Sequence, residues 1–329
     1  MKAPSAHASA ASAPASLLLL GEYAVLEEGG EGLALATEPR VHARFTPWSS
    51  LVIVARFAGK ELVWDEAHPE SSLLLSRCVA ACRSRLGDSA AAGRGDRARL
   101  QRIRVDIDGT AFFAADGSKL GLGSSAATAV ALCALLLAAG GLGGDELEAA
   151  LFPTALAAHR AAQGGRGSGY DVAASCWGGP GLFVGGARPR WLPLAVSALP
   201  PFVLSRGRAP VSTPAAIDRY LAWKERAPAA AADFVAASNA RVEAYAAARD
   251  APARLSLIAE AAREGGRLGS LIGVPAAPLP AGRGGAPGYE PVVKPLGAGD
   301  ELFASFFPEI SAVPKGSAEV KPAEGLRWE

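Results

Sequence analysis

The chain has 329 residues, of which 50% are apolar and 20% charged, and its formal net charge is +1. This length can bury a large core and predicts two domains or one large one. A charge so near zero argues against a general nucleic-acid or membrane-surface partner, so local charges would have to hold an anionic ligand. The composition is that of a soluble globular protein.

Four cysteines lie within apolar or helical patterns without C-x-x-C spacing, namely Cys78, Cys82, Cys133 and Cys176. Buried thiols in a reducing cytoplasm are the simplest interpretation, and no histidine cluster supports a metal site at Cys78 and Cys82. Residues 120–144 carry no charge, but their unbroken apolar part, Ala129 to Ala139, is too short to span a bilayer. The first residues lack the apolar core of a signal peptide, so we expect a cytoplasmic protein.

The N-terminal third of the chain predicts strands and one helix. Residues 1–12 are small and polar and are expected to form a disordered tail, whereas Leu17 to Leu20 have the pattern of a strand buried on both faces. Helical spacing of apolar residues predicts a helix over Ser71 to Leu86. Alternating or continuous apolar patterns predict further strands at 41–45, 51–57, 61–64 and 103–107. Together these elements indicate an α+β domain.

The central stretch, Lys119 to Thr128, reads K-L-G-L-G-S-S-A-A-T. Gly121 and Gly123 let backbone amides turn towards an anion, and Ser124 is placed to cap a helix whose N-terminus carries a partial positive charge. Such a loop predicts a phosphate site, although it is not a Walker A motif because no Gly-Lys-Ser/Thr closes it. Taken alone, the same residues are explained as well by a plain strand-to-helix turn.

A helix predicted over Asp145 to Ala162 leads into a second glycine-rich stretch, residues 164–175, G-G-R-G-S-G-Y-D-V-A-A-S. Asp171 stands near the end of this loop, where glycine neighbours would let a carboxylate approach a ligand without steric conflict. A mobile linker is the competing interpretation. His159 is interpreted as a structural residue at the helix end, because the sequence shows no partner carboxylate beside it.

The C-terminal half predicts a second domain. Short strands are expected at 182–184, 202–204 and 302–307, helices at 229–249 and 253–268, and a Pro-rich crossing between domains at 189–201. Ser212 and Thr213 are good cap residues for a further helix. A third glycine loop lies in residues 292–303, V-V-K-P-L-G-A-G-D-E-L-F, and residues 309–329 are expected to form a charged tail.

Three segments resemble the motifs of the GHMP kinases, in the order in which that family has them. They are A-P-A-S-L-L-L-L-G-E-Y-A-V-L at 13–26, G-L-G-S-S-A at 121–126 and K-P-L-G-A-G at 294–299. The resemblance implies an α+β GHMP kinase fold, with an N-terminal ATP-binding domain like ribosomal protein S5 domain 2 at 13–188. It also implies a ferredoxin-like C-terminal domain at 189–308, with the active site between the two domains.

Within this family, the stretch H-R-A-A-Q-G-G-R-G-S-G-Y-D-V-A-A-S at 159–175 is similar to phosphomevalonate kinases. That similarity implies ATP-dependent phosphorylation of 5-phosphomevalonate to 5-diphosphomevalonate in the mevalonate pathway of isoprenoid synthesis. The expected ligands are ATP, Mg²⁺ and a small phosphorylated substrate, with no nucleic-acid or membrane partner, in a monomer or homodimer. Mevalonate kinase, or another GHMP kinase acting on an alcohol, is the alternative enzyme.

The resemblance also assigns roles to individual residues. Asp171 and Lys119 are the expected catalytic residues, Asp171 facing the acceptor and Lys119 neutralising phosphate charge, and Ser125 is the expected Mg²⁺ ligand. The ATP phosphates are expected to lie on Gly121, Leu122, Gly123, Ser124, Ser125 and Ala126. The residues expected to bind the substrate are Glu22, Tyr23, Ser168, Gly169, Ser212, Thr213, Gly297, Ala298 and Gly299. Arg166, Arg206 and Arg208 are further candidates for the substrate phosphate.

Two departures from the family pattern leave a different class of function open. Ser16 occupies the position where the first motif usually has a lysine, and Asp300 and Glu301 stand where the third motif usually has glycine. Carboxylates beside phosphates repel them unless a cation intervenes. A kinase-like protein that binds nucleotide or metabolite without turnover is therefore a further alternative.

Overall fold

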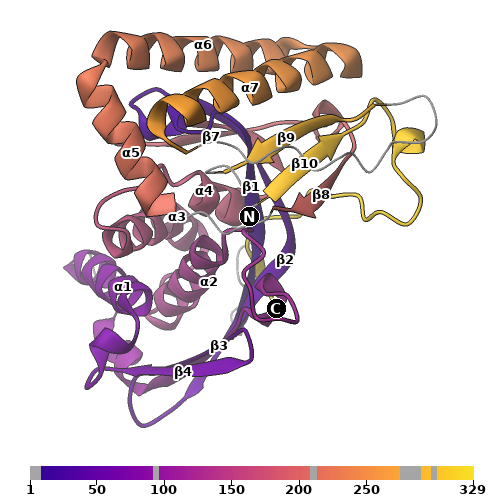
Figure 1. The fold of residues 1–329 in the computed structure, drawn as a ribbon. Helices are drawn as coiled ribbons and strands as arrows, with labels where there is room; N and C mark the ends of the chain where they lie inside the picture. The colour runs from indigo at the N-terminus through magenta and orange to yellow at the C-terminus, as the bar shows by residue number, and fades with distance from the viewer. Residues whose placement is uncertain (1–8, 92–95, 208–212, 275–289, 298–301) are drawn as a thin grey trace. The chain divides into compact units, whose positions relative to one another are not determined.

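The computed structural model describes residues 9–91, 96–207, 213–274, 290–297 and 302–329 (Figure 1). The chain forms two compact units, each built from segments that are not consecutive in sequence. Unit one consists of residues 1–16, 36–178 and 323–329, and unit two consists of residues 17–35 and 179–322. The predicted division at 188/189 did not include this exchange of segments.

Unit one is built on a sheet with the strand order β11-β1-β2-β5-β3-β4. These strands are β1 (Ala10–Leu20), β2 (Glu31–Pro47), β3 (Val52–Phe57), β4 (Lys60–Asp65), β5 (Ile103–Asp108) and β11 (Arg327–Trp328). Strand β5 is antiparallel to β2 and parallel to β3. The strands expected in this part of the chain are therefore confirmed.

Helices gather beside one face of this sheet (Figure 1). They are α1 (Leu73–Ala91), α2 (Ser124–Ala139), α3 (Gly144–Ala162) and α4 (Tyr170–Trp177). Every residue of α2 from Ala126 to Leu137 is buried, because α1, α3 and α4 all pack against it. The uncharged run is thus a core helix, and no helix in the described ranges has the length and hydropathy to cross a membrane.

The cysteines also belong to the core of unit one. All four are free thiols and buried. Burial raises the pKa of the Cys176 thiol, and contact with Cys133 raises that of Cys78. The described residues contain no group of three or more His, Cys, Asp or Glu side chains able to hold a metal ion.

Both ends of unit one contradict the expected tails. Strand β1 begins at Ala10, inside the segment expected to be disordered, because small residues such as Ala11 and Ala13 fit a fully buried strand. The last seven residues belong to unit one, where β11 (Arg327–Trp328) pairs antiparallel with β1. Arg40 holds this segment by donating to the carbonyl oxygens of Glu324 and Gly325, at 3.0 and 2.6 Å.

Unit two contains a separate sheet with the order β8-β10-β9, and a ribbon in which residues 31–35 of β2 pair with β6 and β6 with β7. Its strands are β6 (Pro180–Val184), β7 (Arg190–Pro193), β8 (Phe202–Arg206), β9 (Val292–Leu296) and β10 (Leu302–Phe306). Its helices are α5 (Thr213–Arg226), α6 (Pro228–Ala247) and α7 (Ala251–Ile272). Helix α7 packs against β9.

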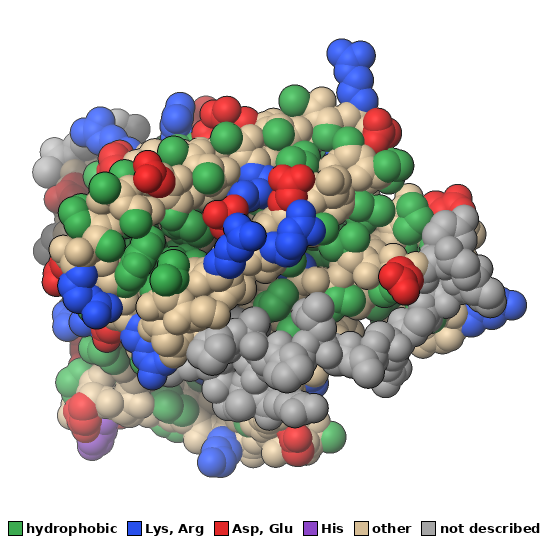
Figure 2. Space-filling view, turned by 45° about the horizontal axis from the view of Figure 1, so that its top comes forward, with side chains coloured by type: hydrophobic (Ala, Val, Ile, Leu, Met, Phe, Trp, Pro, Cys, Tyr) green, Lys and Arg blue, Asp and Glu red, His purple; other side chains and the backbone are tan. Residues whose placement is uncertain are grey.

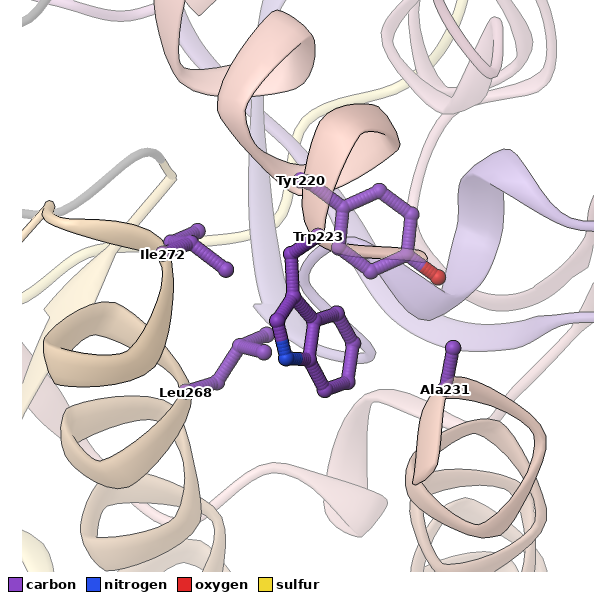
Figure 3. Packing of buried hydrophobic residues seen from close by; sticks show 5 residues of the cluster. All are labelled: Tyr220, Trp223, Ala231, Leu268 and Ile272. Carbon is purple, nitrogen blue, oxygen red and sulfur yellow. The ribbon is translucent and has the colours of Figure 1, made fainter. Parts of the chain in front are cut away.

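The three helices of unit two share an aromatic core. Tyr220 and Trp223 of α5 lie between Leu268 and Ile272 of α7 on one side and Ala231 of α6 on the other (Figure 3). Tyr23, which follows β1, packs on this cluster with its ring stacked on that of Tyr220 at a centroid distance of 5.3 Å. The first sequence motif is thereby fixed to the helices of unit two.

Charge on the surface is mixed in sign. On the face drawn in Figure 2, acidic and basic side chains lie beside one another among hydrophobic ones. This distribution agrees with the net charge of +1 and with ligand recognition by local groups.

Candidate active site

The phosphate loop of unit one adopts backbone angles that its glycines allow. Gly121 and Gly123 have φ angles of 72° and 75°, in the left-handed region that side chains disfavour. Gly123 is the residue that precedes α2, and its carbonyl oxygen accepts hydrogen bonds from the amides of Ala126 and Ala127. The prediction that Ser124 caps the helix is wrong, because Ser124 is already its first helical residue.

This geometry leaves the N-terminus of α2 able to receive an anion. The first amides of an α-helix have no partner within the helix, and no side-chain cap satisfies those of α2. The helix carries no acidic residue in its own first turn, so no side chain of α2 opposes the partial positive charge of the amides there. Phosphate oxygens are the group that such a terminus holds well.

Ser16 lies directly behind the phosphate loop. Its amide donates to the carbonyl oxygen of Leu122 at 3.1 Å, and its side chain is 3% exposed. A Cβ atom built on Gly123 would lie only 2.5 Å from Ser16 Oγ. Ser16 Oγ has no hydrogen-bond partner in the part of the chain that the structure describes. The residue at the usual lysine position therefore serves as packing beneath the loop.

A polar cluster joins the phosphate-loop helix to the helix that carries Asp171. His159 Nε2 lies 3.1 Å from Ser125 Oγ on α2, 3.2 Å from Gln163 Nε2 just after α3, and 3.8 Å from Asp171 Oδ2 on α4. The His159 side chain is almost fully buried, whereas the Asp171 side chain keeps 18% of its surface exposed. Asp171 thus has one side on the cluster and another open to a ligand.

The sequence did not predict that His159 belongs to the polar cluster with Ser125 and Asp171. Its partner carboxylate lies twelve positions further along, on a short helix that was expected to be a glycine loop. One signal was present: Gln163 directly follows α3, four residues after His159, so the two side chains lie on the same side of the helix end. Two polar residues at that spacing, directly before the aspartate segment, would have indicated a shared site.

Ser168 and Gly169 shape the turn before Asp171. Gly169 has a φ of 91° and starts α4, while Ser168 Oγ accepts from the amide of Tyr170 at 3.4 Å. Arg160 fixes the turn by donating to the carbonyl oxygens of Gly167 and Ser168, at 3.1 and 2.7 Å. These contacts give both residues a structural role, and their binding of substrate stays a prediction.

The expected basic residues lie at the surface. The side chain of Lys119 is exposed, and its backbone pairs with Phe113 just before the loop. Arg166 and Arg206 are also exposed. A long exposed side chain can reorient towards a phosphate, so their proposed roles stay predictions.

In unit two, Glu22 forms a buried ion pair with Lys294, which follows it by 272 positions in sequence. Lys294 is 2% exposed and also donates to the carbonyl oxygen of Pro295 at 3.1 Å. Burial raises the pKa of the Glu22 carboxyl, although the Lys294 ammonium acts in the opposite direction. This pair joins the first and third motifs, a contact that no local sequence pattern reveals.

Tyr23 stands beside this pair in a strained conformation. Its φ of 64° and ψ of −40° lie outside the regions that side chains favour, and such strain concentrates at functional sites. Its hydroxyl oxygen is buried and has no hydrogen-bond partner among the described residues. Burial raises the pKa of Tyr23 to about 12, so it is a hydrogen-bond donor at neutral pH.

A pocket within unit two is lined by the Glu22–Lys294 ion pair and by Tyr23. Glu22, Tyr23, Lys294 and Gly297 contribute to its wall, together with Arg241 of α6. Arg241 is paired with Glu264 of α7 at 2.5 Å. The wall of the pocket therefore combines two ion pairs and a tyrosine with apolar side chains.

Several predicted residues lie outside the described parts of the chain. These are Ser212, Ala298, Gly299, Arg208, Asp300 and Glu301. Thr213 is the first residue of α5 rather than a cap before it, and its side chain is not described. Gly297 ends the described part of the third motif with a φ of 66°, which suits a glycine.

Comparison with known proteins identifies the part of unit one that carries the phosphate loop and Asp171. Residues 74–179 match the family described as GHMP kinases N terminal domain. The chain contains a GHMP kinase N-terminal domain. The resemblance drawn from the three motifs is confirmed. A search of curated protein sequences found no match.

Solved structures show the same GHMP kinase fold over nearly the whole length. A Lin0012 protein from Listeria innocua has a TM-score of 0.75 at 19% identity, covering 96% of this chain and 99% of its own. Streptococcus pneumoniae phosphomevalonate kinase, solved with phosphomevalonate and AMPPNP, has a TM-score of 0.71 at 17% identity, covering 92% and 93%. Methanococcus jannaschii mevalonate kinase has a TM-score of 0.59 at 11% identity, covering 97% and 98%. The expected α+β fold is thus confirmed.

Proposed function

We propose that this GHMP kinase-fold protein transfers a phosphoryl group from ATP to 5-phosphomevalonate, forming 5-diphosphomevalonate, in the cytoplasm. The observation that carries the proposal is the cluster in unit one, where Ser125 of the phosphate loop and Asp171 both lie within 3.8 Å of one imidazole nitrogen. A site for the transferring phosphate and a carboxylate for an acceptor thereby adjoin each other. The similarity of fold to a phosphomevalonate kinase supports the same acceptor.

The donor set fits ATP and Mg²⁺. The uncapped amides at the start of α2 suit phosphate oxygens, and the hydroxyl of Ser125 is a hard oxygen ligand of the kind that Mg²⁺ prefers. Ser125 would hold the cation, and Lys119 would reach the phosphates from the surface before the loop. Bound Mg²⁺ supplies positive charge to the phosphoryl group in transfer.

Asp171 would orient the acceptor more than deprotonate it. A phosphate monoester has a second pKa of about 6 and is mostly ionised at neutral pH, whereas an alcohol must lose its proton during the transfer. The first motif offers no cation at Ser16, and the buried position of that residue leaves it facing the loop backbone. A phosphate acceptor tolerates that absence better than an alcohol does, which favours phosphomevalonate over mevalonate.

Ser168 and Gly169, which lead to Asp171 in unit one, are proposed to bind the acceptor. In unit two, Glu22 and Tyr23 line a pocket of their own and are proposed to bind a ligand there. The buried Tyr23 hydroxyl, which has no partner among the described residues, is a donor ready for a ligand oxygen. We therefore propose that Tyr23 binds a ligand of this pocket, with Lys294 fixing its neighbour Glu22.

The decisive test is ADP release by the purified protein with Mg²⁺ and ATP, offered 5-phosphomevalonate or mevalonate in parallel. Turnover with phosphomevalonate alone is the expected result, and turnover with mevalonate alone would overturn the assignment. Asp171→Asn should abolish turnover while leaving nucleotide binding intact. Nucleotide binding without ADP release from either acceptor would favour the alternative of a kinase-like binding protein, to which the missing cation at Ser16 points.

A further inference from the structure

His159 occupies a position that links the two halves of the proposed reaction site. It is 2% exposed and lies on α3, while its neighbours Ser125 and Asp171 lie on α2 and α4. The three helices pack on one another, so the imidazole is held from several sides. Burying a polar ring costs free energy unless its nitrogens find partners, and Nε2 finds them in this cluster.

We propose that His159 is a positioning residue, whose Nε2 holds the Ser125 hydroxyl and the Asp171 carboxylate in one fixed arrangement. The inference rests on the proposed phosphoryl transfer and deepens it. Ser125 belongs to the side that would hold nucleotide and cation, and Asp171 to the side that would face the acceptor. A single imidazole that contacts both sides sets the distance between them.

The contacts explain why a histidine serves here. Ser125 Oγ at 3.1 Å is within hydrogen-bond distance of Nε2, so one rotamer of the hydroxyl is selected. Asp171 Oδ2 at 3.8 Å is too far for a hydrogen bond but close enough for electrostatic attraction to a ring N–H. The side-chain amide of Gln163, 3.2 Å from Nε2, packs beside the ring and limits its rotation.

Positioning matters in this reaction because little covalent chemistry is left to the protein. Phosphoryl transfer is accelerated by alignment and by stabilisation of charge. A misplacement of about 1 Å, even by a residue that does not touch the substrate, costs on the order of 10²-fold in rate. Replacing a residue that orients a metal ligand has an effect of similar size, a loss of about 10- to 100-fold in metal affinity or activity.

The test compares His159→Leu, which removes the ring nitrogens, with His159→Gln, whose amide nitrogen reaches the place of Nε2. For His159→Leu we expect kcat to fall about 10²-fold and the KM for the acceptor to stay within about threefold. Calorimetric titration should show about tenfold weaker binding of a non-hydrolysable ATP analogue with Mg²⁺, and unchanged binding without Mg²⁺. His159→Gln should recover most of both losses.

Thr154→Val is the matched control. Thr154 is also buried on α3, but among the described residues its hydroxyl bonds only to the carbonyl oxygen of Ala150 on its own helix. This variant should keep wild-type kcat and Mg²⁺-dependent binding, and its melting temperature shows what the loss of a buried hydroxyl does to stability alone. In a double-mutant cycle, Ser125→Ala should cost less in the His159→Leu background than in the wild type, because part of the role of Ser125 depends on its contact with His159.

Two results would overturn the inference. Wild-type kcat and binding in folded His159→Leu would show that the ring positions nothing. Equal losses in His159→Leu and His159→Gln, scaling with a fall in melting temperature, would reduce the residue to packing. The binding titration distinguishes a failure of this inference from a failure of the proposed function. If the wild-type protein binds Mg²⁺ and nucleotide but turns over neither acceptor, the proposed function is refuted. The difference in binding between the variants still tests the role of His159 in that case.

Discussion

Gly123→Ala tests whether the phosphate loop depends on its close contact with Ser16. Two costs follow from the structure. Gly123 has a φ of 75°, and the left-handed conformation costs a non-glycine residue roughly 1–2 kcal/mol. The new Cβ would also lie 2.5 Å from Ser16 Oγ, and forcing such a contact inside a packed region costs about 1–3 kcal/mol more. The total expected loss is roughly 2–5 kcal/mol of unfolding free energy.

A second variant separates the two costs. Ser16→Ala removes the hydroxyl, and the next Ser16 side-chain atom, Cβ, is 3.8 Å from the place that the new methyl group would take, an ordinary contact. In the Ser16→Ala background, Gly123→Ala should therefore cost only the backbone term of roughly 1–2 kcal/mol. Gly117→Ala is the matched control, since Gly117 has a φ of 79° but nothing within 4 Å of its added Cβ.

Urea unfolding of the four variants gives these differences directly, and titration with Mg²⁺ and ADP gives the consequence for the loop. We expect at least about tenfold weaker nucleotide binding in Gly123→Ala and no weakening in Gly117→Ala, because only the former lies in the phosphate loop. The same destabilisation by Gly123→Ala with and without the Ser16 hydroxyl would refute the contact. A loss below about 0.5 kcal/mol would refute the left-handed loop itself.

Two further predictions concern buried charge. Burial raises the pKa of Glu22 above its ordinary value of 4.5, so the folded chain holds this proton more tightly than the unfolded chain, and stability is lost as pH rises from 4.5 through the raised pKa. Glu22→Gln should therefore flatten the dependence of the urea midpoint on pH above 4.5, and an unchanged slope would exclude Glu22 as its source. Arg40→Met should lower the unfolding free energy by about 3 kcal/mol or more, because Arg40 donates to Ser12 and to Gly325 from a buried position. Wild-type stability of that variant would show that these carbonyl groups find other partners.

The sequence predicted helices and strands correctly wherever the apolar residues followed one clear periodicity. Leu17 to Leu20 lie in a buried strand and Asp145 to Ala162 in a helix, as their patterns indicated. The prediction failed where small residues take the buried positions that large apolar residues usually occupy. Ala11 and Ala13 form buried strand positions without the bulk that marks a strand, and Tyr170 to Trp177 form a helix directly after a glycine loop.

Individual residues of the candidate site were predicted from the sequence, whereas the contacts between them were mostly not. The glycine loop and Asp171 were identified as candidates because glycine, serine and aspartate carry recognisable chemistry at short range. The wrong cap at Ser124 arose because Gly123, through its left-handed backbone, already ends the loop. His159 and Lys294 were missed in their roles because their partners are supplied by tertiary packing, which no local spacing encodes.

The exchange of segments between the units affects the order in which the protein can fold during synthesis. Unit one includes residues 323–329, and unit two extends to residue 322. During synthesis, strand β1 is made before every other strand that the structure describes, yet its edge partner β11 is the last of them. An unpaired strand edge is a template for wrong association, so this edge of β1 stays exposed until β11 has been made. A protein fused close after β11 would therefore interfere with the pairing of β11 and β1 in the unit that contains the phosphate loop.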